Sequence, residues 1–199
     1  MYKMTHSLLE RWRRATDPDA EESAFGDFLD ALERKRKPTT KAMQAGIDFE
    51  KAVTDFANNP QSIFTSNASA DDTRAIIQIG GRLSGASFQV KYSKPIEIYK
   101  TPLLLVGVAD ALRAGIISDI KRVQRYEYGK YQLSTQHPMY MELFPEALRF
   151  DYLIFDGKYC YMEQYRRGDF EPIQGTIKAF LEYLDGADLM ETYKKNWEV

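Results

Sequence analysis

The residues best suited to chemistry in this chain are two aspartates and a lysine on adjacent predicted strands. Asp110 closes an apolar run, and Asp119 and Lys121 follow it after a short turn. Gln136 and Tyr140, four residues apart, share one face of a predicted helix. Two carboxylates beside an amine suit the metal-assisted hydrolysis of a phosphodiester bond.

The turn between the two strands decides how closely the aspartates approach. If it is centred between Ala114 and Gly115, Asp110 and Asp119 lie equally far from the turn and face each other. Lys121 joins them because side chains two residues apart share a face. Facing carboxylates repel, and a divalent cation removes that repulsion. Mg²⁺ prefers one or two carboxylates, water and substrate phosphate, so we expect both aspartates to bind it.

Neighbouring residues extend this predicted site. The backbone carbonyl of Ile120 could add a metal ligand, and Glu50, on a preceding helix, could be a third carboxylate for the same metal or for a second one. Lys121 could position the nucleophile or stabilise negative charge on the scissile phosphate. Gln136 and Tyr140 carry neutral donors that could hold phosphate oxygens or orient the lysine.

Each of these residues also has an ordinary structural explanation. Charged pairs on an exposed sheet face are common and add little to stability. Asp110, however, interrupts the apolar strand at 103–109, where an acid is costly. We therefore favour a functional site over surface decoration.

Hydrophobic periodicity predicts helices, then a strand meander, a helix, a hairpin and further helices. This order predicts one domain of the α/β (mixed α+β) class, with a mixed central sheet flanked by helices. The expected helices are at 4–15, 25–33, 40–57, a short one through 76–79, 134–143, 173–183 and 189–197, and the strands at 88–99, 103–112, 116–123, 150–155 and 158–165.

Composition excludes several classes of protein. The 199 residues suffice for one domain with a sizeable core, and a hydrophobic fraction of 44% excludes a disordered chain. No apolar run approaches the roughly 18 residues that span a membrane. The first 14 residues lack a signal-peptide core, so we expect a cytoplasmic protein with no membrane partner.

Charge and cysteine content narrow the options further. The net charge of −2 gives no global signal for nucleic acid, although basic residues cluster at 11–14 and 34–37. Cys160 is the only cysteine, which excludes an internal disulfide and a four-thiolate zinc or iron–sulfur site. We expect it to be a buried, inert strand residue.

Four motifs together resemble the RecB-like branch of the PD-(D/E)XK nuclease superfamily. That branch carries Gly-x-x-x-acid/His on a helix, Gly-x-x-Asp and Asp/Glu-x-Lys on successive strands, and Gln-x-x-x-Tyr on a later helix. The chain has these motifs in the same order, at residues 46–50, 107–110, 119–121 and 136–140. Each motif alone is weak evidence for the resemblance, but four motifs in the same order on the expected elements are much stronger evidence.

The resemblance implies a restriction-endonuclease-like αβββαβ core and a DNA nuclease that uses Mg²⁺, with Mn²⁺ as a substitute. The core would span about 40–165, with added helices at 1–39 and 170–199. Glu50 would occupy the position where many relatives carry histidine. The implied roles are metal binding for Asp110 and Asp119, catalysis for Lys121, and placement of substrate and lysine for Gln136 and Tyr140.

Departures from the family pattern refine this expectation. Ala109 replaces the motif proline, and Glu50 in place of histidine favours an oxygen-only, hard-metal site. The absence of a cysteine cluster excludes the iron–sulfur members. With no helicase motor, the chain resembles stand-alone, phage-type nucleases of the host cytoplasm, and we favour an exonuclease in DNA recombination or end processing over an endonuclease.

Two other functions stay open at this point. One is a catalytically silent DNA- or protein-binding module on the same fold. The other is a domain with no nucleic-acid role whose charges are surface decoration. Expected partners are DNA and either a second copy of the chain or a recombination protein.

Overall fold

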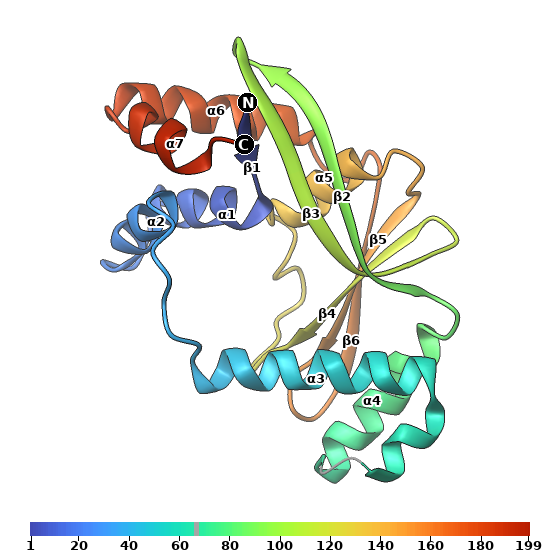
Figure 1. Ribbon diagram of the computed structural model, residues 1–199. Coiled ribbons are helices and arrows are strands. Elements are labelled where there is room, and N and C mark those ends of the chain that lie inside the picture. The colour runs from blue at the N-terminus through green and yellow to red at the C-terminus, as the bar shows by residue number, and fades with distance from the viewer. Residues whose placement is uncertain (66–67) are drawn as a thin grey trace.

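The computed structural model describes residues 1–65 and 68–199 of the chain. Figure 1 shows helices packed on both sides of a strongly twisted sheet. In chain order the elements are β1 (Tyr2–Met4), α1 (His6–Ala15), α2 (Ala24–Leu32), α3 (Lys41–Asn58), the 3₁₀ helix η1 (Pro60–Thr65), α4 (Ala70–Arg82), β2 (Ser87–Ile98), β3 (Thr101–Arg113), β4 (Ile116–Arg122), α5 (Gln136–Leu143), β5 (Arg149–Phe155), β6 (Cys160–Arg166), α6 (Ile173–Gly186) and α7 (Met190–Trp197).

The sheet is mixed, as predicted. Its order is β1-β3-β4-β5-β6, with β2 paired to β3 off this path. The pairs β1–β3 and β4–β5 are parallel, and the other pairs are antiparallel. The elements α3, β2, β3, β4, α5 and β5 follow the expected αβββαβ order, with α4 inserted after α3. The predicted fold class, a mixed α/β domain with helices around a central mixed sheet, is confirmed.

Two hydrophobic clusters cover the two faces of the sheet. The larger joins β3, β4 and β5 to α1, α2, α5, α6 and α7, and has Ile117 and Phe150 on the sheet side. The smaller joins the sheet to α3 and α4 through Ile120, Leu153 and Phe155. Because side chains alternate along a strand, Asp119 and Lys121 share the face of Ile117.

Local sequence signals set the ends of the helices near the predicted site. Thr5 caps α1 by accepting a hydrogen bond from the backbone N–H of Leu8, at 3.4 Å. Thr40 caps α3 in the same way through Met43, at 3.2 Å. Such caps satisfy backbone donors that a helix start leaves unpaired.

Three sequence predictions need correction. The first helix begins at His6, because Tyr2–Met4 form the parallel strand β1. Helix α4 continues through the glycines at 80–81, and Gly80 permits close packing because a Cβ there would lie 3.0 Å from the carbonyl oxygen of Val53. Cys160 is half-buried, at the start of β6, where burial raises the pKa of its thiol.

No helix within residues 1–65 and 68–199 is both long and apolar enough to cross a membrane. The two ends of the chain lie side by side, as Figure 1 shows. The backbone N–H of Val199 donates a 3.0 Å hydrogen bond to the carbonyl of Met1.

Candidate active site

The candidate site forms along one edge of β3. On this edge β1 pairs with residues 103–105 and β4 pairs with 111–113, so the described strands leave 106–110 unpaired there. The hydroxyl of Tyr140 donates to the carbonyl of Val108 at 2.7 Å and accepts from its N–H at 3.1 Å. The carboxylate of Asp110 accepts the N–H of Ile120 at 2.9 Å. The Tyr140 hydroxyl therefore replaces a missing strand partner of β3, and the Asp110 side chain satisfies the N–H that β4 leaves unpaired at Ile120.

The two aspartates lie where β3 and β4 separate. The ladder pairs Ala111 with Ser118 and Arg113 with Ile116, which is the register expected from a turn centred between residues 114 and 115. Asp110 and Asp119 are the next positions beyond this ladder, which accordingly opens between them. The wedge between the strands gives their oxygens space that a continuous ladder would not.

Asp119 is the most highly connected acid of the site. It is 5% exposed, and its Oδ1 accepts a 2.5 Å hydrogen bond from Nε2 of Gln136. Its Oδ2 lies 2.7 Å from Nζ of Lys121 in an ion pair. Burial lowers the pKa of Lys121, but the charge and hydrogen bond of Asp119, together with the charge of Asp110, outweigh burial and raise it, so the amine stays cationic.

Negative charge accumulates beyond what Lys121 balances. Burial, followed by the charges of Asp119 and Glu50, raises the pKa of Asp110 to about 8. Burial and then Asp119 also raise the pKa of Glu50, whose helix α3 packs against β4. The site is therefore short of positive charge when no cation is bound.

Gln89 belongs to this site, although no sequence signal indicated it. It lies between the paired residues Phe88 and Val90 of β2, in register with Asp110 on β3. Its φ of 51° is in the left-handed region, which is rare for a side-chain-bearing residue in a strand. Its Nε2 donates a 2.6 Å hydrogen bond to Oε1 of Glu50.

His6 is a second residue that sequence reasoning missed. Its ring centroid lies 5.7 Å from that of Tyr140, in an edge-on arrangement. Burial lowers the pKa of His6 to about 4, while Asp119 opposes and Lys121 adds to the shift. The imidazole is therefore neutral at physiological pH and can exchange hydrogen bonds beside the acids.

The two residues of the predicted helix motif, Gln136 and Tyr140, are both buried. Gln136 and Tyr140 are 6% and 5% exposed, and their hydrogen bonds go to Asp119 and to the backbone of Val108. The structure thus gives both a positioning role, and contact with substrate stays a prediction. His137 is buried, with its ring stacked 4.1 Å from that of Tyr165.

The site residues could hold a hard cation through oxygen atoms alone. Asp110, Asp119 and Glu50 supply carboxylates, and Ile120 a backbone carbonyl. Within the described part of the chain, no three His, Cys, Asp or Glu side chains already form a metal-ligand cluster. The metal-binding roles of these four residues accordingly stay predictions.

Comparison with known proteins gives information about the fold. No family model matches the chain, and no curated protein matches it. Among solved structures it is similar to SSO0001, with a TM-score of 0.56 and 14% sequence identity. The match covers 94% of this chain and 77% of SSO0001. At this identity the likeness shows a shared fold over almost the whole chain.

Proposed function

We propose that the protein is a DNA nuclease dependent on Mg²⁺ or Mn²⁺, of the RecB-like PD-(D/E)XK type. The observation that carries this proposal is the arrangement around Asp119. This buried carboxylate lies beside Asp110 where two strands separate, is held by Gln136 on one oxygen, and is ion-paired with Lys121 on the other. A surface charge pair would not need a buried amide donor from another element.

The donor set fits a hard divalent cation. All candidate ligands are oxygen atoms, which Mg²⁺ and Mn²⁺ prefer. The raised pKa of Asp110, about 8, reflects burial and carboxylate charge that a cation would offset. Held by Asp110 and Asp119, such a cation would supply Lewis acidity toward the phosphate and a water of lowered pKa.

The protein's own groups would then orient and stabilise the reaction. Lys121, kept cationic by Asp119, would stabilise negative charge developing on the phosphate or position the nucleophile. Gln136 would hold Asp119 in one orientation, and Tyr140 would fix the strand that carries Asp110. Glu50, positioned by Gln89, would add a third carboxylate at the edge of the site.

The loop that follows β4 suits contact with a nucleic-acid strand. Tyr131 lies close enough for Lys121 and Asp119 to influence its pKa, which burial raises to about 12. Earlier in the same loop, Tyr128 is 94% exposed, beside Lys130 and beside Arg125, which is ion-paired with Glu127. Basic groups bind phosphate, and exposed aromatic rings stack on unpaired bases.

A catalytically silent DNA- or protein-binding module is the second candidate. It is favoured by the absence of a ready three-ligand cluster among residues 1–65 and 68–199, and by Lys121 occupying one oxygen of Asp119. The nuclease proposal has three further parts. We propose an exonuclease role in recombination or end processing and a cytoplasmic location. The partner would be a second copy of the chain or a recombination protein.

The test is a cleavage panel with purified protein. Linear duplex, covalently closed circular duplex and single-stranded DNA are each incubated with Mg²⁺, Mn²⁺ or EDTA, and Asp110→Asn protein purified in parallel controls for contamination. We expect metal-dependent loss of linear DNA that the variant lacks. Cutting of the closed circle would identify an endonuclease. DNA binding without cleavage in either metal would contradict the nuclease proposal and favour the silent module.

A further inference from the structure

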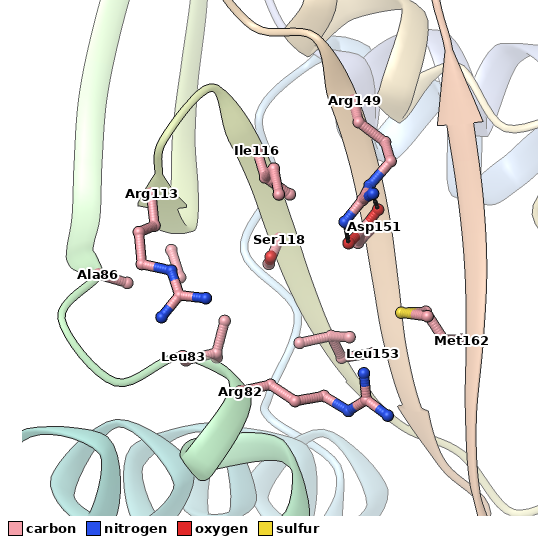
Figure 2. A pocket seen from close by; sticks show the side chains of 11 residues that line it. Arg82, Leu83, Ala86, Arg113, Ile116, Ser118, Arg149, Asp151, Leu153 and Met162 are labelled. Atoms are coloured by element: carbon pink, nitrogen blue, oxygen red, sulfur yellow. Dashed lines mark hydrogen bonds and ion pairs between the residues drawn. The ribbon is translucent and has the colours of Figure 1, made fainter.

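A second hollow lies on the opposite face of the sheet from the candidate active site. Its volume is about 180 Å³, and its walls include Arg82, Arg113 and Arg149 (Figure 2). Ser118 and Asp119 are neighbours on β4, so their side chains point to opposite faces. The hollow therefore shares the strands of the candidate site but none of its residues.

The three arginines come from separate elements. Arg82 ends α4, Arg113 ends β3 and Arg149 begins β5. In Figure 2 their side chains surround Ser118 and Leu153. Three guanidinium groups around so small a space offer N–H donors from three directions.

Only part of this positive charge is balanced within the protein. Arg149 is neutralised by the buried Asp151, which accepts hydrogen bonds from its Nε and Nη2 at 2.6 and 2.8 Å. Arg113 donates only to the backbone carbonyl of Ser84, at 2.5 Å. Arg82 is exposed, and the structure gives it no hydrogen bond or ion pair with the residues that it describes. The hollow is thus lined by three guanidinium groups and one carboxylate, that of Asp151, which leaves the exposed Arg82 and Arg113 without a carboxylate partner among the described residues.

The rest of the lining is suited to a non-polar group. Leu83 and Leu153 are both 4% exposed, and Met162 lies beside them. Besides Asp151, the buried polar side chain of the lining is Ser118, which is 6% exposed. An occupant would therefore present an anionic head to the arginines and an apolar portion to these side chains.

We propose that this hollow binds a small phosphate monoester through Arg82 and Arg113. A monoester carries nearly two negative charges at neutral pH, which matches the two unbalanced guanidinium groups. The planar fork of arginine fits phosphate oxygens in paired hydrogen bonds. A polymeric phosphodiester carries one charge per phosphate and needs a groove open at both ends. This assignment does not depend on the nuclease proposal.

The test is a titration of the ¹⁵N-labelled full chain in EDTA at constant ionic strength. The probes are phenyl phosphate, inorganic phosphate and benzoate. We expect phenyl phosphate to bind most tightly and to shift the amide signals of Arg113, Ser118 and Leu153. The double variant Arg82→Gln/Arg113→Gln should weaken its binding at least about tenfold, since hydrogen bonds to charged groups are lost. Arg36→Gln, at an exposed position elsewhere, should leave the affinity unchanged.

Several results would overturn the assignment. They are unchanged affinity in the double variant, benzoate binding as tightly as phenyl phosphate, and shifts that map away from the hollow. A fourth combines two observations: the wild type does not bind phenyl phosphate, and the double variant loses affinity for duplex DNA. The arginines would then be contacts for a nucleic-acid backbone. If the double variant does not fold, the signal mapping on the wild-type chain decides alone.

Discussion

Nε2 of Gln136, on helix α5, donates a 2.5 Å hydrogen bond to Oδ1 of Asp119, on strand β4. Both side chains are nearly buried, at 6% and 5% exposure. The amide fixes one oxygen of the carboxylate and leaves the other to the 2.7 Å ion pair with Lys121. The start of α5 therefore sets the orientation of the central acid of the site.

Replacing Gln136 by alanine should affect both stability and activity. A buried carboxylate oxygen would lose its donor, which should lower the free energy of unfolding by about 1–3 kcal/mol. DNA cleavage should fall as well, because Asp119 would no longer be held in one orientation. Urea unfolding and a cleavage assay measure the two effects. Gln132→Ala, at an exposed position in the preceding loop, is the matched control, and equal behaviour of the two variants would contradict this role.

Tyr140→Phe isolates the role of a single hydroxyl. The variant keeps the ring but leaves the N–H and carbonyl of Val108 without their side-chain partner. We expect the free energy of unfolding to fall by about 1–3 kcal/mol. Tyr159→Phe, at a residue that is 55% exposed, should change the free energy of unfolding little. If Tyr140→Phe were as stable as the control while cleavage fell, the hydroxyl would act on substrate instead.

Gln89→Gly should move stability and activity in opposite directions. Glycine relieves a backbone strain of about 1–3 kcal/mol at the φ of 51°. It adds an entropic cost of about 0.5–1 kcal/mol, so the free energy of unfolding should rise by about 0.5–2 kcal/mol. Cleavage should fall, because Glu50 loses its 2.6 Å donor. Ala114→Gly, at a turn residue with a φ of 49°, should give the gain in stability alone. Full activity in Gln89→Gly would remove Gln89 from the site.

The raised pKa of Asp110 predicts a pH dependence of stability in EDTA. Its carboxyl has a pKa of about 8 in the folded chain against an ordinary value of 3.8, so the folded state holds a proton that the unfolded chain has released. The free energy of unfolding should therefore fall as the pH rises from about 4 to about 8. Asp110→Asn should remove this fall, and urea unfolding of both proteins at pH 5 and pH 8 measures it. Parallel pH profiles would show that Asp110 does not titrate in this range.

Local patterns predicted most of the elements and two relationships between site residues. The short turn at Ala114 and Gly115 fixed the register of β3 against β4, and hence the neighbouring positions of Asp110 and Asp119. Four-residue spacing likewise put Gln136 and Tyr140 on one helix face, toward the acids. These relationships are encoded over short separations, where turn geometry and side-chain period decide the outcome.

Other features depend on tertiary contacts that no local pattern carries. Strand β1 has three residues and forms only because it pairs in parallel with Leu103 and its neighbours, far along the chain. Gln89 reaches Glu50 through an unusual backbone angle in β2, which amino-acid type does not signal. His6 approaches the acids because α1 packs against α5. In the sequence, its position near the start of a helix indicates only a capping role.

The most direct test of the account is the rate of linear duplex cleavage by Asp119→Asn in Mg²⁺. The substitution keeps the side-chain shape but removes the charge that would hold the cation and Lys121. We predict a rate at least about a hundredfold below wild type, with an unchanged circular dichroism spectrum. Asp55→Asn, at the exposed ion pair with Lys51 on α3, should cleave at the wild-type rate. Wild-type cleavage by folded Asp119→Asn would contradict the central claim that this buried aspartate serves a metal-dependent nuclease.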